Sequence, residues 1–335
     1  MSRADSLSSW QDDWAGLSAV IWGLGEEGFA AADTLVELGV SVTMLTEHDD
    51  ADRITVLDVL GVATLTLPPS DWLAHTESAS PDLVILTPGV SVDSHRRQSL
   101  RERGVAVWTP LELAFRVADK VDGGPQIVLV GGGHARQIAD LAHQLLLAAG
   151  MRSFRAGTDI ASALDGIRLP DGLDVLVVDV GSQELEVWSD GAPSVRHPQL
   201  SVCIDDEHPL EHSLLLELYR DTVTACVYRR GAGATERAVE DAWVVEGCRA
   251  IGVGLDSPGM SDLGRVEDIV CDRAFLHDRA DRALELCTTD ELTRAGLESP
   301  EHALSAVASF AIARAFSVAP ELIGQELARW GGLSE

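Results

Sequence analysis

A glycine-rich stretch between an apolar run and a helical stretch has the composition of a loop that holds phosphate. Its residues are Gly131, Gly132, Gly133, His134, Ala135, Arg136 and Gln137. Such a loop needs glycines so that backbone N–H groups converge on phosphate oxygens, then a lysine for the terminal phosphates and a hydroxyl for Mg²⁺. The last two positions hold Arg136 and Gln137, and a planar guanidinium and a long amide are poor replacements. The stretch predicts a phosphate-loop scaffold that has lost its chemistry, or a turn kept for packing alone.

A second glycine motif lies near the start of the chain. Its residues are Gly23, Leu24, Gly25, Glu26, Glu27 and Gly28, in a G-x-G-x-x-G pattern between an apolar run and a helical stretch. Glu47 follows at about the spacing of a ribose-binding acid. Two like charges 4 Å apart repel by about 4 kcal/mol at an effective dielectric near 20, so Glu26 and Glu27 oppose a phosphate at this turn unless they point away. The motif predicts a weakened diphosphate site or a turn that kept its glycines for packing.

Further chemistry-bearing residues follow two later apolar runs. Asp179 ends the run Asp-Val-Leu-Val-Val-Asp, where metal-binding acids of nucleotide-binding sheets commonly lie, although an acid that caps a turn is the alternative. Glu207, His208 and His212 form a small cluster in an expected loop. Pro209 disfavours the helical turn that would bring the two histidines together. We expect solvated loop histidines and no bound metal.

Composition limits the classes of function. The chain has 335 residues and a formal net charge of −29, which makes nucleic acid and anionic membranes unsuitable partners because the field repels polyanions. Of the 25 basic residues only Lys120 is a lysine. Any mechanism that needs a lysine must therefore use Lys120.

The chain carries no feature of a membrane or secreted protein. It has no apolar stretch of about 18 residues, and its first 14 residues are polar and acidic, so we expect a cytoplasmic protein without membrane insertion. The cysteines are widely spaced without CxxC pairs, which argues against a zinc site or a disulfide framework. We expect small core residues at Cys203, Cys226, Cys248, Cys271 and Cys287.

The elements that must position these residues alternate between strands and helices. Strands are expected at 17–22, 40–45, 63–65, 83–86 and 105–108, and helices at 29–38, 53–60, 94–103 and 110–116. This alternation predicts an α/β fold with a doubly wound, parallel, Rossmann-like sheet, whose ligands bind at the carboxyl ends of the strands. The polar, glycine-rich stretch 117–125 predicts a domain boundary. Beyond it we expect strands at 126–130, 173–179, 200–204 and 225–228, helices at 138–149 and 214–219, and a helix pair at 299–316 and 320–330.

Taken together, these stretches resemble the Mur ligases of bacterial peptidoglycan synthesis over essentially the whole chain. The first domain matches at 23–33, at Leu-Thr-Pro-Gly-Val (86–90) and at 107–114; the second matches at 130–138, 179–185, 207–208, 225–228 and in the helices from Glu301. The resemblance implies a UDP-sugar-binding domain at 1–120 and a P-loop-type central domain at 126–335 that binds ATP and Mg²⁺. It places the UDP-sugar at the first glycine turn and at Thr87, Pro88 and Gly89. The family's third domain, which supplies the amino-acid site, is expected to be absent.

The resemblance also implies that the catalytic groups have changed. Arg136 stands at the position of the family's phosphate lysine, Gln137 at its Mg²⁺ hydroxyl, and Asp179 at its metal-binding glutamate, while His208 matches its metal-associated histidine. The metal-binding lysine that follows in the family has no counterpart. Late nucleotide contacts fall on Arg229, Glu301, His302 and Ser305.

These departures predict a non-catalytic relative, a pseudoenzyme with a binding or regulatory role and a protein partner in cell-wall synthesis. No cofactor is expected, and UDP-sugar binding is expected to be weak or absent. An active ATP-dependent ligase, which would use ATP and Mg²⁺, is the first alternative. A nicotinamide-dependent oxidoreductase built on the first glycine motif is the second.

Overall fold

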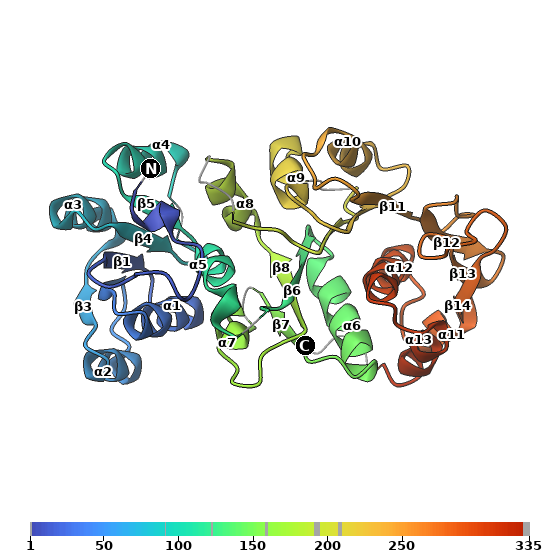
Figure 1. Cartoon of the computed structure of the whole chain (residues 1–335), viewed down its shortest axis with the longest axis horizontal. Coiled ribbons are helices and arrows are strands. Elements are labelled where there is room, and N and C mark those ends of the chain that lie inside the picture. The colour runs from blue at the N-terminus through green and yellow to red at the C-terminus, as the bar shows by residue number, and fades with distance from the viewer. Residues whose placement is uncertain are drawn as a thin grey trace. The chain divides into compact units, whose positions relative to one another are not determined.

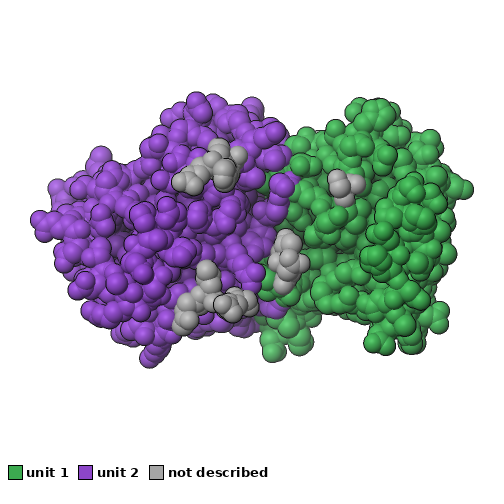
Figure 2. Space-filling view, turned by 180° about the vertical axis from the view of Figure 1, so that it is seen from behind, with its two compact units in different colours: residues 1–125, 156–172, 183–196 green, residues 126–155, 173–182, 197–335 purple. Residues whose placement is uncertain are grey.

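The computed structural model describes residues 2–90, 92–121, 123–157, 160–190, 195–206 and 210–330. They cluster into two compact units (Figure 2). Unit 1 comprises 1–125, 156–172 and 183–196, and unit 2 comprises 126–155, 173–182 and 197–335. The division into domains at 1–120 and 126–335 that the resemblance implies stays a prediction.

Unit 1 contains a five-stranded sheet in the order β3-β2-β1-β4-β5, in which every pairing is parallel. Its strands are β1 (Ser18–Trp22), β2 (Ser41–Thr46), β3 (Ala63–Thr66), β4 (Leu83–Leu86) and β5 (Ala106–Trp108). The central strands β1 and β4 are apolar runs that helices bury on both faces, as parallel sheets require. The predicted doubly wound parallel sheet is confirmed.

Helices alternate with these strands (Figure 1). They are α1 (Glu26–Glu37), α2 (Ala51–Val59), α3 (Pro69–Ala79), α4 (Ser94–Glu102) and α5 (Pro110–Arg116), with short 3-10 turns at Ala4–Ser6 and Ala118–Lys120. Sequence analysis did not predict α3. Its start carries a proline in the first turn, and its Trp72 packs edge-on against Trp22 at 6.0 Å between ring centroids.

Two later segments of the chain complete unit 1. They contain α7 (Ala163–Ile167) and α8 (Ser182–Ser189), of which all but the first residue belongs to this unit. The Trp188 ring lies 6.0 Å from Phe115, and the Arg196 guanidinium lies 3.9 Å above Trp188. Arg196 also pairs at 3.4 Å with the buried Glu112. The core of unit 1 therefore includes side chains from beyond residue 180.

Unit 2 contains a nine-stranded sheet in the order β14-β13-β12-β11-β10-β9-β6-β8-β7. Its strands are β6 (Gln126–Gly131), β7 (Ser153–Ala156), β8 (Val175–Val180), β9 (Leu200–Cys203), β10 (Ala225–Arg229), β11 (Arg249–Val253), β12 (Asp262–Val266), β13 (Ile269–Asp272) and β14 (Leu284–Thr288). The pairings from β8 through β12 are parallel, whereas β12, β13 and β14 pair antiparallel. The second sheet is therefore mixed.

The helices of unit 2 pack a large apolar core against this sheet. They are α6 (Ala135–Ala148), α9 (His212–Tyr219), α10 (Gly233–Asp241), α11 (Thr289–Arg294), α12 (Pro300–Ala315) and α13 (Pro320–Leu327). Helix α12 packs beside α6 (Figure 1), where the Ser309 hydroxyl donates to the Ile138 carbonyl at 3.0 Å. The predicted helix pair at the end of the chain is confirmed. None of the helices in the described ranges combines the length and apolarity needed to span a bilayer.

Candidate functional site

The first glycine turn lines a pocket of about 520 Å³ in unit 1, where strands β1, β2 and β4 end. Parallel strands present their ligand site at this edge of the sheet. Two neighbouring segments of unit 1 form the rest of the wall. The lining residues are Gly23, Leu24, Gly25, Glu26, Glu27, Thr46, Glu47, His48, Asp50, Trp72, Thr87, Pro88, Gly89, Val90, Gly157, Ile160, Ala161 and Ser162. The structure thus brings both predicted turns and Glu47 together in one pocket. Of the residues predicted for this site, only Gly28 does not line the pocket.

Close packing explains two glycines of this turn. Gly23 has a φ of +106°, and a Cβ there would collide with the Thr87 hydroxyl, which donates to the Trp22 carbonyl at 2.7 Å. A Cβ on Gly28 would collide with the Gly23 carbonyl. The turn therefore needs Gly23 and Gly28 for packing whether or not it holds a phosphate.

The two acids of this turn already have partners. Glu26 is exposed and forms an ion pair with Arg53 of α2, and Glu27 accepts a hydrogen bond from the Ser162 hydroxyl at 2.6 Å. Arg53 also pairs with Asp50 at 3.4 Å. The expected repulsion by two bare carboxylates is therefore reduced, because a guanidinium beside Glu26 offsets part of its field.

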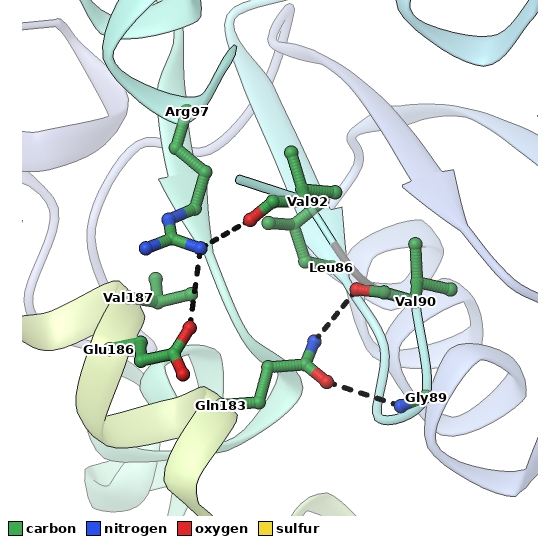
Figure 3. Close-up of a pocket in the computed structure, with 8 residues that line it drawn as sticks. All are labelled: Leu86, Gly89, Val90, Val92, Arg97, Gln183, Glu186 and Val187. Atoms are coloured by element: carbon green, nitrogen blue, oxygen red, sulfur yellow. Dashed lines mark hydrogen bonds and ion pairs between the residues drawn. The ribbon is translucent and has the colours of Figure 1, made fainter. Parts of the chain in front are cut away.

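The side chain of Gln183, in α8, binds the turn at residues 87–90, which is the second of the two turns that line this pocket (Figure 3). Its side-chain amide donates to the carbonyls of Thr87 at 3.0 Å and Val90 at 3.3 Å, and accepts from the Gly89 N–H at 3.1 Å. One side chain thus satisfies three backbone groups of the turn. Sequence analysis placed Gln183 in a family motif without giving it a role, and the turn it holds lies 94 residues earlier in the chain.

Arg97 anchors the segment that carries Gln183. It is buried, donates to the Val92 carbonyl and pairs with Glu186 at 3.6 Å (Figure 3). It also pairs with Asp190 at 2.6 Å. Arg97, Glu186 and Gln183 line a cavity of about 170 Å³ with five apolar or glycine neighbours. A buried arginine with carboxylate partners fixes the position of α8 against the turn.

The second glycine loop leads from β6 into α6 in unit 2. Gly132 has a φ of +94°, His134 precedes the helix, and Ala135 begins it with an ordinary helical conformation. The turn therefore needs no left-handed backbone at Ala135. The Arg136 side chain is exposed, whereas Gln137 is buried and its amide nitrogen has no hydrogen-bond partner in the described residues.

A carboxylate lies on this loop. The Gly133 N–H donates to Asp205 Oδ2 at 2.7 Å, and a Cβ on Gly132 would collide with the same carboxylate. Asp205 follows β9, the neighbour of β6 in the sheet, and is only 6% exposed. Sequence analysis missed this residue, although an acid after a strand beside the loop strand was a signal for it.

Asp179 of β8 is held by an arginine. Arg155 is buried between Asp179, at 3.1 Å, and Asp140 of α6, at 2.8 Å. Burial raises the pKa of Asp140 and lowers that of Arg155, and their ion pair opposes both shifts. The acid that the resemblance assigns to a metal therefore faces a guanidinium.

In this structure a carboxylate contacts the loop that the resemblance assigns to phosphate, and an arginine pairs with the acid that it assigns to the metal. Among the described residues no group of three His, Cys, Asp or Glu is arranged to hold a metal ion. Glu207, His208 and Pro209 lie outside those residues, and His212 pairs with Asp241 at 3.2 Å.

The late nucleotide positions that the resemblance implies have local structural contacts. Arg229 pairs with Asp206 at 3.4 Å. The His302 N–H is capped by Ser299 at 3.2 Å, and the Ser305 hydroxyl donates to the Glu301 carbonyl at 2.9 Å. These contacts belong to a surface ion pair, a helix end and a helix interior.

Two cysteines lie together in spite of their sequence spacing. The Sγ atoms of Cys226 and Cys248 are 3.9 Å apart, because β10 and β11 pair in parallel. The hydrogen bond from Cys226 lowers the pKa of Cys248, while the pKa of Cys226 is raised by the same contact and by burial. All five thiols are free, and four are buried, as predicted for core cysteines.

Comparison with curated proteins finds relatives that are named as ligases. No family model matches the chain. A UDP-N-acetylmuramoylalanine–D-glutamate ligase of Leifsonia xyli subsp. xyli is 38% identical over 96% of this chain and 65% of its own length, and one of Tropheryma whipplei (strain Twist) is 35% identical over 98% and 69%. The chain thus spans about two thirds of the curated relatives it matches.

Solved structures agree in fold. The structure of a UDP-N-acetylmuramate:L-alanyl-gamma-D-glutamyl-meso-diaminopimelate ligase from Neisseria meningitides has a TM-score of 0.56 at 11% identity and covers 96% of this chain and 100% of its own. A murein peptide ligase from Psychrobacter arcticus 273-4 has a TM-score of 0.55 at 13% identity, over 95% and 69%. The two-unit α/β fold described above is therefore shared with these ligases.

Proposed function

Because the chain belongs to the family of UDP-N-acetylmuramoylalanine–D-glutamate ligases (MurD), we propose that it acts in peptidoglycan biosynthesis as a non-catalytic member with a binding or regulatory role. One observation supports this proposal: Arg155 is buried against Asp179, the acid that the resemblance assigns to the family's metal. ATP-dependent ligation uses Mg²⁺ to neutralise phosphate charge. Whether Asp179 is available to bind Mg²⁺ therefore decides whether the chain can be an active ligase.

A metal ion would have to displace the guanidinium. Arg155 has an 8% exposed side chain and two carboxylate partners, and breaking a buried ion pair costs about 3–5 kcal/mol. Arg136 adds a second positive charge near the loop, because its field is felt at Asp140. These groups already balance the carboxylates that a divalent cation would need.

The binding role is proposed for unit 1. Its pocket keeps the turns that the resemblance assigns to a UDP-sugar, but four acids line it: Glu26, Glu27, Glu47 and Asp50. Arg53 offsets one of these charges. We therefore propose weak or absent UDP-sugar binding and a protein partner in cell-wall synthesis as the physiological ligand.

The test is an assay of the purified chain with ATP, Mg²⁺, UDP-N-acetylmuramoyl-L-alanine and D-glutamate, with the Leifsonia xyli relative as the positive control. We expect no formation of ADP and no ligated product. Turnover that is abolished by Arg136→Ala would overturn the proposal.

The alternative is an active ligase that adds D-glutamate to UDP-N-acetylmuramoyl-L-alanine with ATP and Mg²⁺. The identities of 38% and 35% to proteins named as such ligases favour it. The oxidoreductase alternative rests on the first glycine motif and on Glu47 in the same pocket. Titration calorimetry separates the three: ATP-Mg²⁺ binding favours the ligase, NAD(H) binding the oxidoreductase, and neither the non-catalytic protein.

A further inference from the structure

We propose that the Asp205 carboxylate is the resident anion of the second glycine loop, where it takes the place of a phosphate group and keeps phosphate ligands out. The inference deepens the proposed lack of nucleotide chemistry and rests on it. It attributes the lack of nucleotide chemistry to the Asp205 carboxylate, which a substitution can remove.

The contact geometry is that of an anion on a loop. The Gly133 N–H donates to Asp205 Oδ2 at 2.7 Å, a charge-assisted bond of the length expected for a carboxylate. Both oxygens and the carboxyl carbon of Asp205 lie closer than van der Waals distance to the point where a Gly132 Cβ would stand. The carboxylate therefore lies directly against the loop, and only a glycine at 132 leaves room for it.

The position of the loop favours a negative charge. Helix α6 has 14 residues and begins at Ala135, two residues beyond Gly133, so the positive end of its dipole faces the loop. A phosphate group in such a loop uses the same backbone donors and the same dipole. Asp205 supplies a charge and oxygen acceptors of the same kind from within the chain.

Burial is the second, independent observation. Asp205 is 6% exposed, and its Oδ1 has no hydrogen-bond partner among the described residues. A carboxylate oxygen buried without a partner is unfavourable, so the contacts of Oδ2 and the helix dipole must hold the group in place. Oδ1 therefore adds negative charge at the loop without a hydrogen bond of its own among the described residues.

The neighbouring acid provides a matched control. Asp206 is exposed and pairs with Arg229 at 3.4 Å, away from the loop contacts of Asp205. Its removal changes the net charge of the chain by the same amount. If the lower negative charge alone improved anion binding, removal of either acid would improve it. If the removal of Asp205 opens a site, only the Asp205 variants bind the anion better.

The experiment is calorimetric titration of the full chain with inorganic pyrophosphate. We expect no measurable binding by the natural chain, and binding with a Kd at least tenfold lower in Asp205→Ala and Asp205→Ser. Asp206→Ala should behave as the natural chain does. Asp205→Asn keeps the shape of the side chain without its charge, and should gain less than Asp205→Ala because its amide still covers the loop.

Thermal unfolding gives a second readout. Asp205→Ala should melt below the natural chain without added anion, and millimolar pyrophosphate should recover part of that loss in this variant alone. If Asp205→Ala does not fold, Asp205→Ser and Asp205→Asn carry the comparison.

Two outcomes would overturn the inference: pyrophosphate binding by the natural chain as tight as by Asp205→Ala, or no gain in any folded Asp205 variant. Either outcome can occur without ligase turnover, so the inference can fail while the proposed function stands. Turnover by the natural chain would instead refute the proposed function.

Discussion

The two glycine turns of this protein are built alike, but their acidic side chains lie in different places. Each leads from a parallel strand into a helix, and each has acids within reach. In unit 1 the acids Glu26 and Glu27 stand on the helix and bind Arg53 and Ser162, so the turn borders a pocket. In unit 2 the acid Asp205 comes from a neighbouring strand and lies on the loop itself.

This difference teaches that the element carrying an acid decides its effect on a phosphate-type turn. An acid in the first turn of the helix projects sideways, where a cation from another helix can bind it. An acid at the end of the adjacent strand points at the loop N–H groups and competes with any ligand for them. Residue type alone therefore does not separate an open turn from a filled one.

The largest expected effect tests the packing of the first turn. Gly28→Ala should lower the free energy of unfolding by about 3 kcal/mol, because the new Cβ collides with the Gly23 carbonyl and the backbone must move. Gly25→Ala is the control, since its Cβ meets nothing within 4 Å. Urea unfolding followed by tryptophan fluorescence suits this test, because six of the eight tryptophans lie in unit 1. Equal effects of the two substitutions would show that the turn is not closed by its own backbone.

An intermediate effect tests the fastening of the second turn of the pocket. Gln183→Leu removes three hydrogen bonds and should cost about 2 kcal/mol of unfolding free energy. It should also speed hydrogen exchange at the Gly89 amide. Gln98→Leu is the control, because the exposed Gln98 side chain donates to Glu102 of the same helix at 3.1 Å and belongs to no turn of the pocket. Unchanged exchange at Gly89 would contradict the role given to Gln183.

The smallest expected effect tests the electrostatics of the open turn. Glu26→Val with Glu27→Ser should strengthen binding of UDP-N-acetylmuramoyl-L-alanine by about 1 kcal/mol, roughly fivefold, because the charge of Glu26 is already partly offset by Arg53. Calorimetry on both proteins measures it, with the surface variant Glu102→Ser as the control. Tight binding by the natural chain, or no gain from the double substitution, would remove charge as the distinction between the turns.

Local sequence patterns predicted the strands and helices well. They did not predict the site contacts that join residues far apart in the sequence. Strand β4 and helix α5 match their predicted bounds because continuous apolar runs and a Thr-Pro helix start are local signals. Gly23 and Thr87 were placed in one site through family motifs, and they do share a pocket. By contrast, Asp205 meets Gly133 across 72 residues, and Arg155 meets Asp179 across 24. Such pairs depend on strand order, which periodicity does not contain.

Unit 1 is made of three separate segments of the chain, so it cannot be complete until the last of them has been synthesised. A chain synthesised at about 5–20 residues per second makes Arg196 roughly 4–14 s after Pro125. During that interval Glu112 has no Arg196 to pair with, and Phe115 has no Trp188 to pack against. The strand and loop of the second glycine turn are made before the first unit has received its last side chains. The first unit is therefore completed only after synthesis of the second unit has begun, at residue 196, while most of the second unit is still to be made.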